Sequence, residues 1–176
     1  MHCFTFFDTV LGRCAVAWGP RGIGAVELPG ADEGATRRRI RRALPGARES
    51  SPPPPDVQRT IEAIAGLLDG EADDLASVVL DMEGLPEFHR RVYDVARAIP
   101  PGATLTYGEV ADRVGERGAA QAVGQALGAN PFPIVVPCHR VLAAGGALRG
   151  FSAPGGIDTK RRMLAIEGAL APALFD

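Results

Sequence analysis

The stretch NPFPIVVPCHRVLAAGG, residues 130–146, sets an apolar run directly before Pro137, Cys138, His139 and Arg140. A short apolar run bounded by proline and glycine is typical of a buried strand. Cys138 and His139 combine a nucleophile with a base, but neighbours on a strand point to opposite faces. Contact between the two side chains therefore requires a sharp turn or an intervening water. We predict a buried strand that ends in such a turn, with Cys138 as a candidate nucleophile.

The residues alone leave other interpretations of Cys138 open. An isolated buried cysteine is usually a small core residue. A cysteine beside a histidine is also compatible with a hydrolase, which needs a third group to orient the base. Asp158 and Glu167 are candidates for that group, and the sequence does not choose between them.

The composition is that of an ordinary globular chain. Its 176 residues are 46% hydrophobic and 23% charged, and no apolar run approaches the roughly 20 residues of a membrane span. The odd number of cysteines predicts reduced thiols and a cytoplasmic location. Cys3, Cys14, His2 and His89 match no metal-ligand spacing, so no metal site is expected.

Charge is distributed unevenly between the two halves of the chain. Residues 1–84 carry 9 Arg against 13 Asp and Glu, a net charge of −4, whereas residues 85–176 carry 9 Arg and Lys160 against 8 Asp and Glu, a net charge of +2. This asymmetry permits an anionic partner for the second half without requiring one. The arginines within residues 37–42 are interpreted as a solvated helix face, with phosphate binding as the lesser alternative.

The first half has the pattern of a small α+β sheet domain. The expected elements are strands at 3–7, 13–18 and 23–28, helices at 31–44 and 57–68, and a further strand at 77–82. Asp56 is expected to cap the second helix, and Gly70 to follow its end.

The second half has a helical pattern. A helix is expected at 88–99, ended by PPG, and Thr106 is a suitable cap for a short helix over 107–114. The turn GERG then leads to a second short helix at 119–127, which predicts a helix-turn-helix or an ordinary helical hairpin. The surface of this second helix is almost entirely Ala, Gly and Gln. Such a helix either packs closely on a neighbour or approaches a flat, continuous surface such as a DNA groove.

With these residues described, the chain resembles the O6-alkylguanine-DNA alkyltransferases, also called methylated-DNA–protein-cysteine methyltransferases. The sequence NPFPIVVPCHRV carries the resemblance, which is strong over residues 88–168 and looser over 4–80. It implies an α+β fold. An N-terminal sheet domain with flanking helices, ribonuclease-H-like or ferredoxin-like, would span residues 1–84. A mainly helical winged helix-turn-helix domain, which binds DNA and carries the catalytic site, would span residues 85–176.

The resemblance also implies an activity. Members repair DNA by moving the alkyl group of O6-alkylguanine to a cysteine in a single, self-inactivating turnover; O4-alkylthymine is a second candidate lesion. The base must rotate out of the duplex to be reached. The implied partner is double-stranded DNA bound through its minor groove, with no cofactor, no membrane association and no obligate protein partner. A cytoplasmic monomer is expected.

Four residues correspond to the family's catalytic positions. Cys138 matches the alkyl acceptor, and His139 the base that activates it through a water. Glu167 lies where the family keeps the acid that orients the histidine. Tyr107 matches the tyrosine that protonates guanine N3 as the base leaves. His139 and the positive charge of the second half further predict a lowered pKa for the Cys138 thiol.

Five residues correspond to positions that hold the rotated base. Asn130 matches the asparagine that ties the helix-turn-helix to the active-site turn. Pro133, Phe151 and Ser152 match pocket walls, with the Ser152 N–H expected near guanine O6. The carbonyls of Val141 and Cys138 would accept the exocyclic amine.

The predicted DNA contacts come from the second short helix and the signature. Ala120, Gln121, Ala122 and Gly124 lie where the family's recognition helix meets the minor groove, and Arg140 is assigned to DNA as well.

Three positions depart from the family pattern. Gln121 replaces an arginine that usually fills the gap left by the rotated base. Ala153 and Pro154 lengthen the loop over the pocket, and Arg149 replaces a small or neutral residue. These departures leave an alternative: a protein of the same fold with weak base flipping or an altered substrate. A cysteine hydrolase and a purely structural domain explain fewer of these residues.

Overall fold

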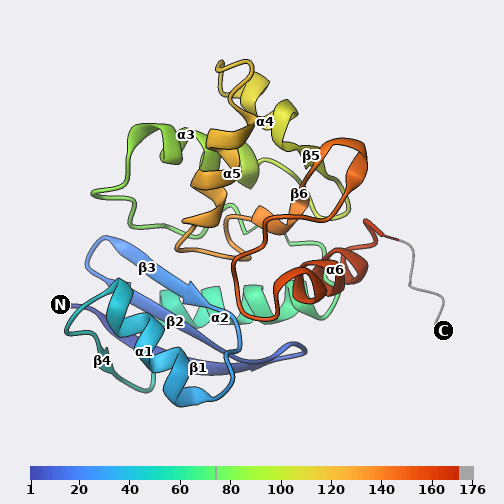
Figure 1. The fold of residues 1–176 in the computed structure, drawn as a ribbon. Helices are drawn as coiled ribbons and strands as arrows, with labels where there is room; N and C mark the ends of the chain where they lie inside the picture. The colour runs from blue at the N-terminus through green and yellow to red at the C-terminus, as the bar shows by residue number, and fades with distance from the viewer. Residues whose placement is uncertain (74, 171–176) are drawn as a thin grey trace.

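The structure is a computed structural model that describes residues 1–73 and 75–170, and it has the α+β architecture expected from the sequence (Figure 1). The N-terminal half forms a four-stranded sheet in the order β3-β2-β1-β4. Its strands are β1 (Cys3–Thr9), β2 (Gly12–Gly19), β3 (Gly22–Glu27) and the short β4 (Arg48–Glu49). The first three form an antiparallel meander, as predicted, and β4 pairs parallel to β1.

The two faces of this sheet are covered by different partners. Helix α1 (Glu33–Ala43) covers one face, where Ile40 packs against Phe4 and the small residues Ala15 and Ala17. Helix α2 (Pro55–Leu68) covers the other face, and its apolar stripe joins a larger core (Figure 1). Because side chains alternate along a strand, one meander supplies both layers.

Two local predictions for this half are wrong. Asp56 does not cap α2: the cap is Pro54, and Asp56 lies in the first turn. Residues 77–82 form no strand but a single bridge, between Leu80 and Ile23. The carbonyls of Leu75 and Val78 accept hydrogen bonds from the Arg97 guanidinium, so this segment turns instead of extending along the sheet.

The second half contains the predicted helix-turn-helix. Its elements are α3 (Glu87–Arg97), β5 (Leu105–Thr106), α4 (Tyr107–Arg113), α5 (Ala120–Gly128), the 3₁₀ turn η1 (Cys138–Arg140), β6 (Val141–Leu142), the 3₁₀ turn η2 (Ala144–Gly146) and α6 (Gly156–Ile166). Thr106 caps α4 as expected, in a reciprocal capping box with Glu109. Tyr93 fixes α5 on α3 by donating from its hydroxyl to the Ala126 carbonyl at 2.7 Å. Strands β5 and β6 pair in parallel, and the loop after β6 forms the wing beside α4 and α5.

One apolar cluster runs through both halves, from Val16 and Val26 of the sheet, through α2, to Val92 of α3 and Met163 of α6. Backbone contacts join the halves as well: the Val26 N–H donates to the Pro131 carbonyl at 2.9 Å. The chain crosses between the halves before α3, and the boundary at residue 84 remains a prediction. Within residues 1–73 and 75–170, no helix is both long and apolar enough to cross a membrane.

Candidate active site

The apolar run before Cys138 is buried as predicted, but it is not a strand. Residues 130–137 form a compact turn with one isolated bridge, between Pro133 and Val136, and Ile134 has a left-handed φ of 77°. Prolines 131, 133 and 137 have no N–H, so the segment cannot donate a regular strand ladder. Asn130 holds the turn closed: its Nδ2 donates to the Val136 carbonyl, and its Oδ1 accepts from the Phe132 N–H, both at 2.9 Å.

Cys138 opens the 3₁₀ turn η1, which supplies the sharp turn that the sequence requires. The predicted lowering of its pKa is wrong. Burial raises the pKa of the Cys138 thiol and outweighs the opposing effects of the Asn130 amide and the Lys160 charge. The resting thiol is therefore protonated, and its reactivity depends on a nearby base.

His139, the next residue, has the chemical properties that such a base needs. Its ring is 1% exposed, and Nε2 lies 2.5 Å from Glu167 Oε1. Burial lowers the pKa of His139 although Glu167 raises it, so the imidazole is neutral. A carboxylate accepts the Nε2 proton, which leaves the lone pair on Nδ1. That Nδ1 is buried and has no hydrogen-bond partner among the described residues.

Arg140, which the sequence assigns to DNA, belongs to the interior. The side chain is 2% exposed, and its Nε and Nη2 donate to the Glu167 carboxylate at 2.6–3.0 Å. Nη1 donates to the Ile99 carbonyl at 2.7 Å. Burial raises the pKa of Glu167, but the hydrogen bonds and charges of His139 and Arg140 together have a larger effect and lower it. The net result is a pKa below the usual value, so the carboxylate is charged. A guanidinium held in this way cannot reach a phosphate, and its role is corrected to holding Glu167.

Tyr107 is the first residue of α4, and its hydroxyl donates to the Arg149 carbonyl at 3.0 Å. Burial, together with the nearby Cys138, raises the pKa of Tyr107, which keeps the phenol protonated. Gly150 has a φ of +70°, and a Cβ there would lie 2.9 Å from the Tyr107 Oη. Glycine is therefore required for the wing to approach this tyrosine.

Six of the nine residues predicted for catalysis and base binding line one cavity of about 130 Å³. Its lining includes Tyr107, Asn130, Pro133, Cys138, Phe151 and Ser152. The lengthened loop contributes Ala153 and Pro154, and Ser152 Oγ donates to the Gly128 carbonyl at 2.9 Å. Val141 is not among the lining residues, and its carbonyl accepts from Lys160 Nζ at 2.7 Å.

Sequence reasoning missed Lys160, Glu27 and Arg39. Lys160 is 1% exposed; its ammonium bonds the Val141 and Arg149 carbonyls and lies 5.8 Å from the centre of the Tyr107 ring. Two signals were present: Lys160 is the only lysine of the sequence, and it precedes Glu167 by two helical turns. Glu27 of β3 and Arg39 of α1 pair at 2.8 Å and line the cavity from the other half of the chain, which no local pattern reveals.

A groove next to this cavity contains the predicted recognition helix. Ala120, Gln121 and Gly124 of α5 line it, whereas Ala122 does not. Within residues 1–73 and 75–170, no cluster of His, Cys, Asp and Glu is arranged to hold a metal ion.

Known proteins resemble this chain in sequence. Residues 87–169 match the family described as 6-O-methylguanine DNA methyltransferase, DNA binding domain. The methylated-DNA–protein-cysteine methyltransferase of Methanothermobacter thermautotrophicus is 40% identical over 156 residues, covering 87% of this chain and 78% of that protein.

Solved structures agree over nearly the whole chain. The O6-methylguanine methyltransferase of Mycobacterium tuberculosis superimposes with a TM-score of 0.74 at 32% identity, covering 98% of this chain and 96% of that one. A crystal structure of that protein in complex with DNA gives the same TM-score at 31% identity, covering 97% and 96% of the two chains. The fold, the cysteine site and these relatives together place the chain in the methylated-DNA–protein-cysteine methyltransferase family.

Proposed function

We propose that this protein repairs double-stranded DNA by transferring the alkyl group of O6-alkylguanine to Cys138, once per molecule. The observation that carries the proposal is the series Cys138, His139, Glu167, Arg140: Cys138 lines a cavity that Tyr107 also lines, and the other three side chains are buried behind it. Family membership supports it, as does the DNA complex of the related Mycobacterium tuberculosis protein.

The reaction begins at the thiol. Because the pKa of Cys138 is raised, its proton must be removed, and neutral His139 offers Nδ1 for that purpose through a bridging water. Charged Glu167 stabilises the imidazolium that forms, and Arg140 holds Glu167 in place.

The displacement then takes place in one step. Cys138 Sγ attacks the alkyl carbon, the bond from that carbon to guanine O6 breaks, and its electron pair moves into the guanine ring. Tyr107 donates a proton to N3, so that neutral guanine leaves, and the proton held by His139 returns to the phenolate through solvent. The product is a thioether at Cys138. The scheme contains no step that hydrolyses this thioether, and no metal or cofactor enters it.

A base paired inside a duplex cannot reach Cys138, so we propose that the alkylated nucleotide rotates into the cavity. Helix α5 would lie against the minor groove, where Ala120 and Gly124 allow close approach. One chain supplies the thiol, the base, its orienting acid and the proton donor, which favours a monomer. The three cysteines are free, which suits the reducing cytoplasm.

One observation favours a second candidate function. Helix α5 carries Gln121 and no charged residue. A protein that recognises alkylated DNA but rotates the base poorly, or one that uses another alkylated substrate, would fit such a helix.

Intact-mass spectrometry after mixing with duplex DNA that contains O6-methylguanine tests the proposal. We expect a gain of one methyl group that stops at one per protein and maps to Cys138. The Cys138→Ala variant should gain nothing and still bind the duplex, whereas Cys14→Ala should react normally. Methylation of Cys3 or Cys14, or no transfer from any duplex, would reject the assignment.

A further inference from the structure

The groove beside the cavity has a volume of about 730 Å³ and lies between α5 and the wing. Its lining is Thr106, Tyr107, Gly108, Ala120, Gln121, Gly124, Gln125, Ala143, Ala144, Arg149 and Gly150. Tyr107 and Gly150 also line the cavity that contains Cys138. A ligand strand in the groove therefore lies next to the entrance used by a rotated base.

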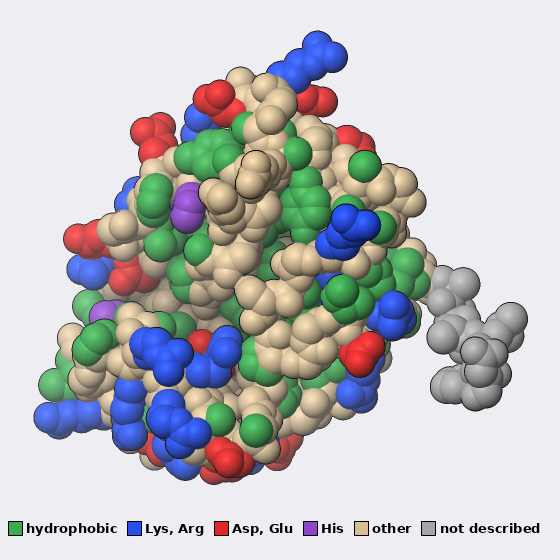
Figure 2. Space-filling view, viewed as in Figure 1, with side chains coloured by type: hydrophobic (Ala, Val, Ile, Leu, Met, Phe, Trp, Pro, Cys, Tyr) green, Lys and Arg blue, Asp and Glu red, His purple; other side chains and the backbone are tan. Residues whose placement is uncertain are grey.

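Charge is scarce in this groove. Arg149 is the one charged residue in its described lining, and α5 has no ionisable side chain along its whole length. Figure 2 shows the same contrast: Lys and Arg side chains gather over α1, whereas the surface over α5 is mostly uncharged. Duplex DNA carries one negative charge per roughly 1.7 Å of its axis, so a groove that binds it needs a cation close by.

Arg149 can supply that cation, because its backbone is fixed and its side chain is exposed. Its carbonyl accepts from the Tyr107 hydroxyl at 3.0 Å and from Lys160 Nζ at 2.9 Å, which fixes the backbone beside the cavity. The side chain is exposed, and its guanidinium forms no ion pair with any residue in the described part of the chain. By contrast, Arg140 and Arg161 of the same half are paired with carboxylates.

We propose that Arg149 binds a DNA phosphate next to the rotated nucleotide, and that the wing thereby supplies the charge that Gln121 does not provide from α5. The inference rests on the proposed function, because it takes duplex DNA as the occupant of the groove. Gln121 offers hydrogen bonds to the unpaired partner base, and Arg149 offers the phosphate contact from the opposite wall. Two residues would then share a task that one arginine on α5 could perform.

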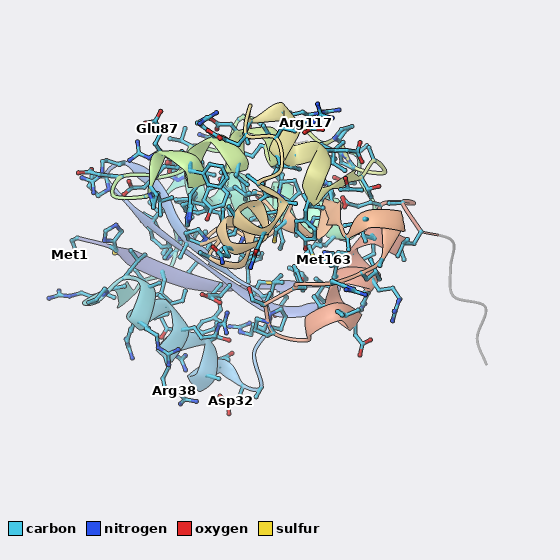
Figure 3. The ribbon with its side chains drawn as sticks, turned by 45° about the horizontal axis from the view of Figure 1, so that its top comes forward. Met1, Asp32, Arg38, Glu87, Arg117 and Met163 are labelled. Atoms are coloured by element: carbon cyan, nitrogen blue, oxygen red, sulfur yellow. The ribbon has the colours of Figure 1, made fainter. Side chains whose placement is uncertain are left out.

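The test compares six proteins: the natural chain, Arg149→Ala, Arg149→Lys, Gln121→Arg, the Arg149→Ala/Gln121→Arg double variant, and Arg42→Ala. Arg42 is a matched control because it is an exposed arginine on α1, which lies on the opposite side of the molecule from the α4–α5 turn marked by Arg117 in Figure 3. Each protein is assayed for methyl transfer from a duplex and from free O6-methylguanine, and for binding to undamaged duplex across a range of salt concentrations.

Loss of one phosphate contact should weaken binding of Arg149→Ala to duplex about tenfold near 0.1 M salt and reduce the salt slope by about one. Transfer from duplex should slow to a similar extent, with transfer from the free base unchanged. Arg149→Lys should keep the slope, Gln121→Arg should restore most of the loss in the double variant, and Arg42→Ala should behave like the natural chain.

Two results would overturn the inference. The first is the same salt slope for Arg149→Ala and Arg42→Ala. The second is that Arg149→Ala slows methyl transfer from the free base as much as transfer from the duplex, which would make Arg149 a residue of the base pocket. Failure of the proposed function gives a different result: no methyl transfer in the natural chain, while the salt slope for undamaged duplex still reports on Arg149.

Discussion

At the scale of single residues, the Cys-His-Arg run separates three roles by burial. Cys138 opens toward the cavity, His139 is buried with a free Nδ1, and Arg140 is turned inward to Glu167. The Glu167 carboxylate thus contacts both the His139 imidazole and the Arg140 guanidinium. The side chain of Glu167 is 3% exposed, so its removal affects both stability and reactivity.

The Glu167→Gln substitution keeps the shape of the side chain but removes the charge that Arg140 and His139 share. Breaking a buried ion pair leaves an uncompensated charge, so we expect a loss of about 3–5 kcal/mol in the free energy of unfolding, measured by urea denaturation. Methyl transfer should slow much more than duplex binding weakens. Glu83→Gln, which removes an exposed partner of Arg21, should change neither quantity appreciably. An unchanged transfer rate in Glu167→Gln would contradict the orienting role.

The free energy of unfolding should begin to fall at mildly acidic pH. Burial holds the pKa of His139 below its usual 6.5, and the contacts of Glu167 hold its pKa below 4.5. In both cases the unfolded chain binds the proton more readily, so the free energy of unfolding falls as pH drops, first below 6.5 through His139 and then below 4.5 through Glu167. Urea midpoints across this range measure the slope.

Histidine variants show which residue causes this pH dependence of the free energy of unfolding. His139→Gln should lose the part of the slope just below pH 6.5, whereas His89→Gln should retain it. If the natural chain is as stable at pH 5 as at neutral pH, His139 is not held neutral by the fold.

At the scale of elements, α6 and α5 make different contributions to the site. One face of α6 delivers Lys160, and the cap of the same helix delivers Glu167. Lys160 ties β6 to the wing through the Val141 and Arg149 carbonyls. Helix α5 contributes instead through the small size of its side chains. Its exposed side is made of small or uncharged residues, and Gly124 lies opposite Tyr107.

Gly124 permits a test of close approach by α5. A Cβ at this position would have its nearest neighbour, Tyr107 Cε1, at 4.0 Å, so alanine fits without a clash. Gly124→Ala should raise the free energy of unfolding by up to about 1 kcal/mol, because alanine favours the helix. Gly124→Leu should slow transfer from duplex DNA more than transfer from free O6-methylguanine, because the larger side chain enters the groove beside Tyr107. Equal effects of leucine on both substrates would show that this side of α5 does not face DNA.

At the scale of the whole molecule, the active site depends on both halves. Glu27 and Arg39 reach the cavity from the sheet and α1, and the Val26 N–H bonds the turn that precedes Cys138. The apolar cluster is continuous across the two halves, which makes separate unfolding unfavourable.

We therefore expect one cooperative unfolding transition. Trp18, the only tryptophan, reports on the sheet, and far-UV circular dichroism reports mainly on the helices. Both signals should give the same urea midpoint. Ile64→Ala in the shared core should lower both midpoints together, at a cost of about 2–5 kcal/mol. Arg59→Ala on the exposed side of α2 should leave them in place, and two separate midpoints would show that the halves unfold independently.

Local pattern by itself determined the strands of the meander, the capped α4 and the helix-turn-helix, because alternation, caps and glycine turns act over a few residues. The family resemblance predicted catalytic roles for Cys138, His139 and Glu167, and the structure brings His139 and Glu167 into contact. The prediction of a strand before Cys138 was wrong, because three prolines and the Asn130 contacts favour a closed turn over the hydrogen-bond ladder of a strand.

The tertiary structure alone decided the electrostatics of the site. Arg140 lies 27 residues from its partner Glu167 and 41 from Ile99, so its inward orientation depends on packing that no local pattern encodes. The raised pKa of Cys138 has the same origin, since burial is a property of the folded cavity. Lys160, Glu27 and Arg39 entered the site for this reason too: the fold, and not the spacing along the chain, determines which charges lose their water and which atoms replace it.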